Sequence, residues 1–140
     1  MSIVASVRSA VATWVDTTLT GITVINEMDT TPASGNWARV SLRLTDSAQV
    51  SACQYHRFDA IIDVFLNEGC PTTGVMLSSR DTCVSQLIMG SASFSAATES
   101  GTRVRCLTAA HESLTETTTG VLRSQVVMPL HLLTNRAIPT

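Results

Sequence analysis

The stretches WARVSLRL (Trp37–Leu44) and QYHRFDAIIDVFL (Gln54–Leu66) alternate apolar and polar side chains with a period of two. Alternation of this length is typical of half-buried antiparallel strands that have one apolar face and one polar face. The polar segment Thr45–Cys53 between them predicts the projecting tip of a hairpin. These residues therefore predict the centre of an antiparallel sheet.

Helical periodicity flanks this hairpin on both sides. Apolar residues recur at three- and four-residue spacing from Ile3 to Leu19, which predicts an amphipathic helix that ends at Gly21. A second helix is predicted over Thr73–Gly90, after a segment of Gly and Pro turn residues. The other predicted strands are Ile22–Ile25, Thr102–Ala109 and Val121–Leu132, with predicted loops at Asn26–Asn36, Ser91–Gly101 and His111–Gly120.

The predicted order of elements is helix, strand, strand, strand, helix, strand, strand. This order predicts an α+β fold, in which a mostly antiparallel sheet of about four to five strands carries two helices on one face. Because Pro129 cannot donate a ladder hydrogen bond, we expect the last strand to lie at an edge or to end there. The 140 residues (1–140) have the length of a single domain.

The composition favours association with other proteins. Charged residues make up 14% of the chain, and all nine basic residues are arginines. A sparsely charged surface rich in Ser and Thr is easily desolvated, and arginine is the cation that interfaces tolerate best. A genomic bias toward G+C-rich codons is the alternative explanation for the arginines. The net charge of −2 argues against a sequence-independent nucleic-acid coat, which needs a basic face.

We expect neither a secretory leader nor a membrane span, because the chain has no basic segment followed by an apolar run and no long apolar stretch. Its four cysteines form no C-x-x-C pair. Synthesis in the reducing interior of a cell favours free thiols, and two disulfides are the alternative.

The sheet face opposite the predicted helices is a candidate subunit interface. It combines aromatic rings, arginines and carboxylates, a mixture that is enriched where subunits meet, whereas an ordinary solvated sheet face is the alternative. Phe94, alone in a loop of small residues, either packs under the helices or anchors a neighbouring subunit. The candidate interface residues are Trp37, Arg39, Arg43, Tyr55, Arg57, Asp59, Asp63 and Phe94, beside Ile61 and Phe65.

No catalytic, cofactor or metal motif is present in the sequence, and we expect no enzyme activity, no cofactor and no metal. His111 and Glu112 lack a second histidine one helical turn away, so we interpret them as a solvated loop pair. His56 lies on the apolar face of its strand, which predicts a hydrogen-bonded histidine of the core or rim, and His131 is interpreted in the same way. Cys70, before Pro71, is the most exposed thiol predicted, although a buried or half-buried structural thiol is the simpler interpretation.

Asp59 and Asp63 share one strand face at a separation of about 13 Å, which is too wide for a catalytic carboxylate pair. We expect each of them to pair across the hairpin with Arg39, Arg43 or Arg57.

Four passages resemble the tail terminator proteins of long-tailed phages. They are the opening helix with Trp14 and the short strand Ile22–Asn26, NWARVSLRL (Asn36–Leu44), RFDAIIDVFLNEGCPTTGVMLSSRDTCVSQL (Arg57–Leu87) and VVMPLHLL (Val126–Leu133). The order of elements over most of the chain carries the resemblance more than any single residue does. The Thr-rich segment Glu112–Thr119 and a short hairpin tip depart from the family pattern.

The resemblance implies a structural virion protein that forms a ring, expected to be hexameric, on the head-proximal end of the tail tube. Such a ring stops tube polymerisation, and its partners are sister copies, the major tail tube protein and the head-completion or neck proteins. Genome DNA would pass through the lumen without specific binding, and no membrane is involved. The implied location is the virion tail, after assembly in the host cytoplasm.

Two other functions remain open from the residues. Another neck protein, such as a tail-completion or head–tail joining subunit, would have a similar α+β fold. A small enzyme or ligand-binding domain would instead bring His56, His111 or Cys70 together with a carboxylate.

Overall fold

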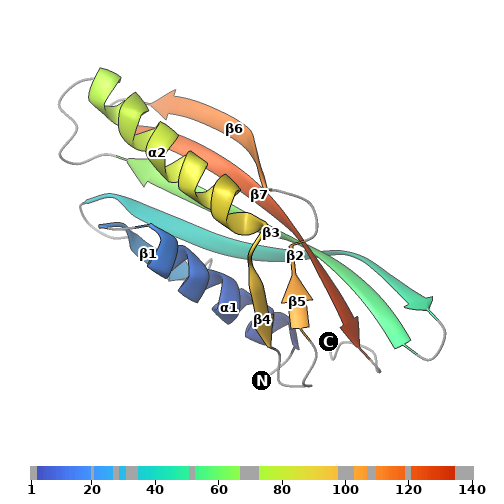
Figure 1. The fold of residues 1–140 in the computed structure, drawn as a ribbon. Helices are drawn as coiled ribbons and strands as arrows, with labels where there is room; N and C mark the ends of the chain where they lie inside the picture. Colours follow the sequence, from blue (N-terminus) through green and yellow to red (C-terminus); the bar gives the residue numbers. More distant parts are fainter. Residues whose placement is uncertain are drawn as a thin grey trace.

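A computed structural model describes residues 3–19, 21–26, 29–30, 35–50, 53–66, 73–97, 103–106, 110–118 and 121–134 of the chain. Within these ranges two helices and seven strands form an α+β fold, as predicted (Figure 1). The elements are α1 (Ile3–Thr18), β1 (Thr23–Asn26), β2 (Trp37–Val50), β3 (Cys53–Leu66), α2 (Thr73–Ser91), β4 (Ser95–Ala97), β5 (Arg103–Arg105), β6 (His111–Thr118) and β7 (Val121–Thr134).

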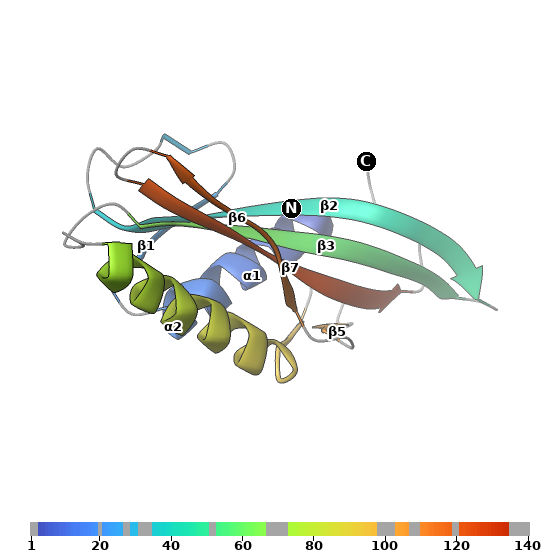
Figure 2. The same cartoon turned by 90° about the horizontal axis from the view of Figure 1, so that it is seen from above.

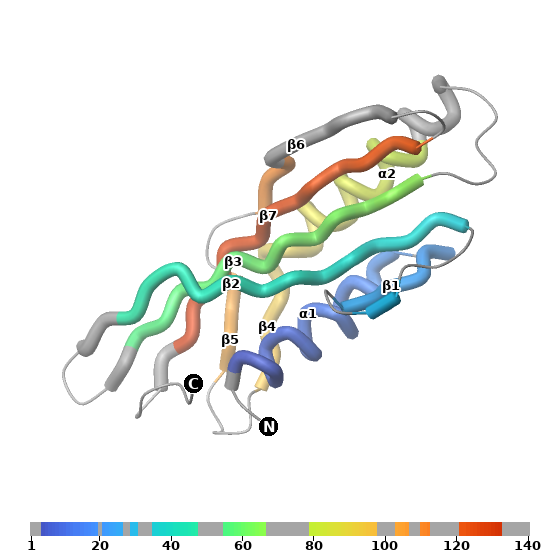
Figure 3. Tube along the Cα trace, turned by 180° about the vertical axis from the view of Figure 1, so that it is seen from behind, coloured from blue at the N-terminus to red at the C-terminus, as the bar shows by residue number. Residues whose placement is uncertain are grey.

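The predicted hairpin is the centre of the sheet. β2 pairs antiparallel with β3, and β3 pairs along its whole length with the antiparallel β7. The order is β1-β2-β3-β7-β5-β4, and β6 also pairs with β7 (Figure 3). The short β1 is parallel to β2, which makes the sheet mixed rather than wholly antiparallel.

Both helices pack on one face of the sheet, and period-two alternation decides which side chains they cover (Figure 2). On β3, Phe58, Ile62 and Leu66 are each at most 1% exposed. From α1, Val7 and Val11 are fully buried against this face. Because Val is a modest helix former, burial stabilises α1 more than intrinsic propensity does. No helix in the described ranges is long and apolar enough to cross a bilayer.

Trp14 of α1 packs against the end of α2 and against Phe94, the residue before β4. Its ring lies 5.7 Å from that of Phe94 in an edge-to-face arrangement, and Phe94 is only 5% exposed. A Cβ atom added to Gly90 would lie 3.3 Å from Cζ2 of Trp14, so the glycine permits this close approach of α2 to α1. Of the two roles considered for Phe94, the structure shows the core one.

The predicted hairpin tip at Thr45–Cys53 was wrong. β2 continues to Val50 and β3 begins at Cys53, so most of the segment is strand. The register shifts between Leu44 and Asp46, and this bulge interrupts the alternation that the sequence pattern relies on. The Thr45 hydroxyl donates to the Arg57 carbonyl at 3.1 Å beside the bulge.

The predicted loop at His111–Gly120 was also wrong, because His111–Thr118 forms β6. Its threonines are β-branched and favour extended backbone, and β7 offers an edge with which to pair. β4 likewise lies inside the predicted loop Ser91–Gly101, and β5 is shorter than the predicted strand Thr102–Ala109.

Pro129 lies in the middle of β7, which neither ends there nor is an edge strand, contrary to both predicted alternatives. On the side of β7 away from β3, β6 pairs with residues up to Val127 and β5 pairs from His131 onward. In the described part of the chain, Pro129 therefore falls in a gap between two partners. Its missing N–H group breaks no ladder on that side.

Candidate functional site

The sheet face opposite the helices, here called the outer face, carries all seven sheet residues of the predicted interface. No described helix lies over this face (Figure 2). Its residues alternate with the buried positions of β2, β3 and β7, so the sequence periodicity correctly separated the two faces. The predicted interface residues on it are Trp37, Arg39, Arg43, Tyr55, Arg57, Asp59 and Asp63.

At one end of the outer face, here called the proximal end, two aromatic rings lie between two arginines. The rings of Trp37 and Phe65 stack at 4.0 Å with an interplanar angle of 12°. The Arg39 guanidinium lies 5.2 Å from the Trp37 ring centroid, and that of Arg123 lies 5.7 Å from the Phe65 centroid. Cation–π attraction and ring stacking therefore hold these four side chains together.

Asp63 completes the proximal end. Its Oδ1 accepts hydrogen bonds from Nη2 of Arg123 at 3.0 Å, from Nε of Arg123 at 3.1 Å and from Nε2 of Gln125 at 3.0 Å. The prediction that Asp63 pairs with an arginine of the hairpin was wrong. Arg39 is its register partner on β2, but the ion pair comes from β7. The Asp63 side chain is only 11% exposed, so these bonds offset its desolvation.

The opposite, distal end of the outer face holds arginines that have no such partners. Within the described residues, Arg43, Arg57 and Arg105 form no ion pair. Asp59 is the register partner of Arg43 but forms no ion pair with it, contrary to prediction. His131 lies between Arg57 and Arg105 in the strand register. The distal end is therefore a cationic surface.

The surroundings of His131 shift the pKa of its imidazole. Burial, and then the positive charge of Arg57, lower its pKa from the ordinary value of 6.5. The Tyr55 hydroxyl and Nδ1 of His131 form a hydrogen bond, and their rings lie 5.5 Å apart. The imidazole therefore adds little positive charge near neutral pH, and the arginines dominate the distal end.

A half-buried apolar strip separates the two ends. Ile61 on β3 is the register partner of Val127 on β7, and Pro129 follows on the same face of β7. The outer face thus has an aromatic end whose arginines are held by rings and by Asp63, an apolar centre, and an end whose arginines form no described ion pair. Such a sequence of surfaces is typical of protein interfaces, in which an apolar patch is bordered by charges.

The histidines and cysteines do not form a reactive centre among the described side chains. Nδ1 of His56 lies 2.8 Å from Oγ of Ser47, and the imidazole is 3% exposed, which confirms a hydrogen-bonded core histidine. Glu112 pairs with Arg80 at 3.2 Å from a strand rather than a loop. Cys70 lies outside the described residues. No group of three or more His, Cys, Asp or Glu residues in the described ranges could hold a metal ion.

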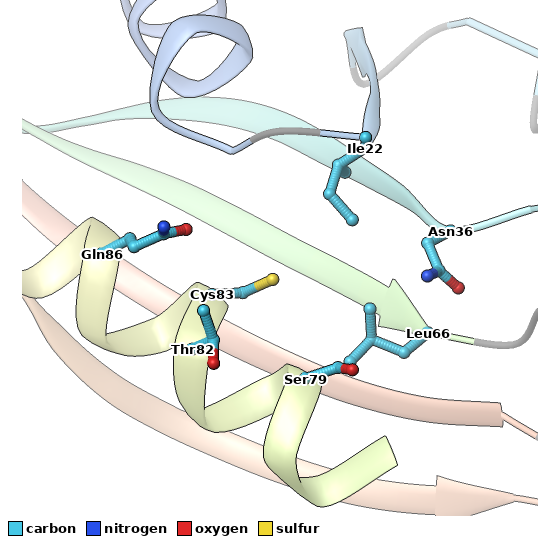
Figure 4. Close-up of a pocket in the computed structure, with 8 residues that line it drawn as sticks. Ile22, Asn36, Leu66, Ser79, Thr82, Cys83 and Gln86 are labelled. Atoms are coloured by element: carbon cyan, nitrogen blue, oxygen red, sulfur yellow. The ribbon is translucent and has the colours of Figure 1, made fainter. Parts of the chain in front are cut away.

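A cavity of about 340 Å³ opens between α2 and the segment that follows α1 (Figure 4). Cys83 points into it from α2, opposite Ile22. Burial raises the pKa of the Cys83 thiol, so it stays protonated and is a weak nucleophile. Cys83 and Cys106 are free thiols, as expected. The cavity is lined by Gly21, Ile22, Asn36, Leu66, Ser79, Thr82, Cys83 and Gln86.

Sequence reasoning missed the contribution of β7 to the outer face. Arg123 and Gln125 bind Asp63, and Val127 extends the apolar strip. The signal was present, because the alternation that buries Leu122 and Val126 places the intervening residues on the opposite face.

The fold has a counterpart among solved structures. One solved structure, whose name states no function, superimposes with a TM-score of 0.58 at 14% sequence identity, covering 97% of this chain and 94% of the other. No protein-family model matches the chain, and no curated protein matches its sequence. Similarity at this level of identity shows the fold alone.

Proposed function

We propose that this protein is a tail terminator of a long-tailed phage, a ring-forming subunit that caps the head-proximal end of the tail tube. The observation that carries the proposal is the outer face, on which aromatic, apolar and arginine side chains lie with no described helix over them. Such a face is stabilised when another protein subunit covers it. The order of elements that resembles this family supports the choice of subunit class.

In this proposal, sister copies meet through two different surfaces, so the contact is heterologous and closes into a ring at a fixed rotation, expected to be sixfold. One ring face fits the last ring of the tube and the other face differs from it, so further tube subunits cannot add. The second face binds the head-completion proteins. The chain's net charge of −2 suits a lumen through which DNA passes without being held.

The test is native mass measurement and negative-stain imaging of the protein, alone and with tail tube protein. A closed ring, alone or on tube ends, is the expected result. A chain that stays monomeric in the presence of tubes contradicts the proposal. Binding to head-closure or portal protein without any affinity for tubes would indicate another neck protein instead.

Arg57→Glu tests the outer face within the same experiment. Because Arg57 is exposed and forms no ion pair among the described residues, charge reversal should weaken ring assembly at least about tenfold while the melting temperature stays near that of the wild type. Arg57→Lys, which keeps the positive charge, is the matched control and should assemble. Equal losses of assembly and of thermal stability would make Arg57 a structural residue.

A further inference from the structure

The outward stripe of α2, here the residues Asp81, Ser85 and Met89, is a second surface that no described helix or strand covers. Asp81, Ser85 and Met89 follow one another at four-residue spacing, and all three are exposed. Met89 is 80% exposed, the highest value among the large apolar side chains described. A shallow groove of about 390 Å³ runs along this stripe. Methionine is flexible and polarizable, and adaptable protein-binding surfaces use it often.

The other helix offers no comparable stripe. Among the α1 side chains that the structure describes, the exposed ones are Ser9, Thr13, Asp16 and Thr17, which are hydroxyls and one carboxylate. Only α2 therefore combines an apolar anchor with a charge at a fixed distance.

The Asp81 end of α2 is acidic. Arg80 lies between two carboxylates, with Nε 2.8 Å from Asp81 and Nη1 3.2 Å from Glu112, so one negative charge remains. The Asp81 side chain is 67% exposed and can accept a further donor. The distal end of the outer face has the opposite balance, because its three arginines outnumber its two carboxylates, Asp46 and Asp59.

The spacing of the two surfaces also matches. Eight residues of helix separate Asp81 from Met89, a rise of about 12 Å. On β3, four residues separate Arg57 from Ile61, a rise of about 13 Å. A helix laid along β3 would therefore bring its carboxylate to Arg57 while its methionine reaches the apolar strip of Ile61 and Val127.

We propose that α2 of one copy lies along the outer face of β3 in the next copy, with Asp81 paired to Arg57 and Met89 packed on the Ile61–Val127 strip. This contact rests on the proposed ring and names its two surfaces. Because α2 and the outer face are on opposite sides of the sheet (Figure 2), each copy uses one surface toward each neighbour. The contact is heterologous, as ring closure requires.

A charge swap tests the contact. Asp81→Arg and Arg57→Glu should each weaken assembly at least about tenfold, because each places like charges together. The variant that carries both substitutions should assemble within about threefold of the wild type, since the pair is restored with its signs exchanged. Asp16→Arg, the same substitution at an exposed site on α1, is the matched control and should assemble normally. Melting temperatures by circular dichroism verify that every variant is folded.

Mixing the two single variants gives a second readout. In an alternating ring, the new arginine of the Asp81→Arg chain meets the new glutamate of the Arg57→Glu chain. At the next contact the unchanged Asp81 of the second chain meets the unchanged Arg57 of the first. Equal amounts of the two chains should therefore form rings of alternating composition with an even number of subunits, visible by native mass spectrometry.

Met89→Ala tests the apolar half of the contact. The site is too exposed for the substitution to affect folding, and we expect assembly to weaken about tenfold with no change in its salt dependence.

The outcomes separate this contact from the proposed function. Rings that form normally with Asp81→Arg, or a double variant as weak as the single ones, overturn the contact and leave the ring in place. If Asp81→Arg forms normal rings that no longer cap tubes, α2 binds the tube protein instead, and this result also overturns the proposed contact. Rescue by the swap without any capping of tubes overturns the terminator function alone. A wild type that is monomeric under all conditions overturns both.

Discussion

At the proximal end of the outer face, Arg39 and Arg123 lie against aromatic rings, and Arg123 also binds Asp63. At the distal end, Arg43 and Arg57 form no ion pair among the described residues. Both ends use the same residue types on the same strands. The difference is in their partners, so the proximal arginines should contribute more to the stability of the fold than the distal ones do.

The largest effect should come from Trp37→Ala at the proximal end. The substitution removes a ring that is 8% exposed, stacked on Phe65 and covered by Arg39, and should lower the free energy of unfolding by about 3 kcal/mol. Urea unfolding measures it. Tyr55→Ala, at the distal end of the same face, should cost about 1 kcal/mol. Equal losses of unfolding free energy in the two variants would show that the proximal and distal ends contribute equally to stability.

Asp63→Asn should have the next largest effect. The amide keeps the shape of the side chain but removes the negative charge that Arg123 binds, and we expect a loss of about 2 kcal/mol, below the value for a fully buried pair because the Arg123 side chain is 30% exposed. Asp59→Asn is the control and should change stability by less than about 0.5 kcal/mol. A larger cost for Asp59→Asn would show that the distal carboxylate is also engaged.

Arg57→Gln should change the free energy of unfolding by less than about 0.5 kcal/mol and should instead change the titration of His131. Removing the positive charge raises the pKa of His131, but the value stays below 6.5 because burial is the larger cause of its depression. NMR titration of the imidazole measures the change. An unchanged or lower pKa would mean that Arg57 does not act on His131.

The smallest effect should be a pH dependence of stability that originates at His131. Its pKa in the folded protein is below 6.5, so the unfolded chain binds more protons when the pH falls below that value. The contribution of His131 to stability is therefore fully present above pH 6.5 and is lost as the pH falls toward its folded pKa. Thermal unfolding at about pH 7.5 and about pH 5.5 should show a smaller decline for His131→Gln. An identical decline would trace it to other groups.

The sequence predicted which side chains face the helices better than it predicted where the strands end and which side chains pair. Alternation along β3 separated Ile62 and Val64 from Ile61 and Asp63 without any knowledge of tertiary contacts. The β2 bulge could not be foreseen, because a register shift at Asp46 is decided by two strands together.

The partner of Asp63 was missed for a related reason. Arg39 and Arg123 are both neighbours of Asp63 in the folded sheet, but only Arg39 is close in sequence. Finding Arg123 required knowing that β7 pairs with β3 across 60 residues of chain. β6 was missed because Thr and Glu are common in loops, and only an available edge on β7 makes them a strand.

The gap at Pro129 limits how the sheet can be mispaired. A strand sliding along the free side of β7 would need a donor at residue 129, and the imino nitrogen has none. An extension of β6 past Val127, or of β5 back beyond His131, would therefore meet a residue that cannot donate a ladder hydrogen bond. The proline therefore disfavours continuous pairing along this side of β7, and natural sheets use prolines in this way to limit edge-to-edge association.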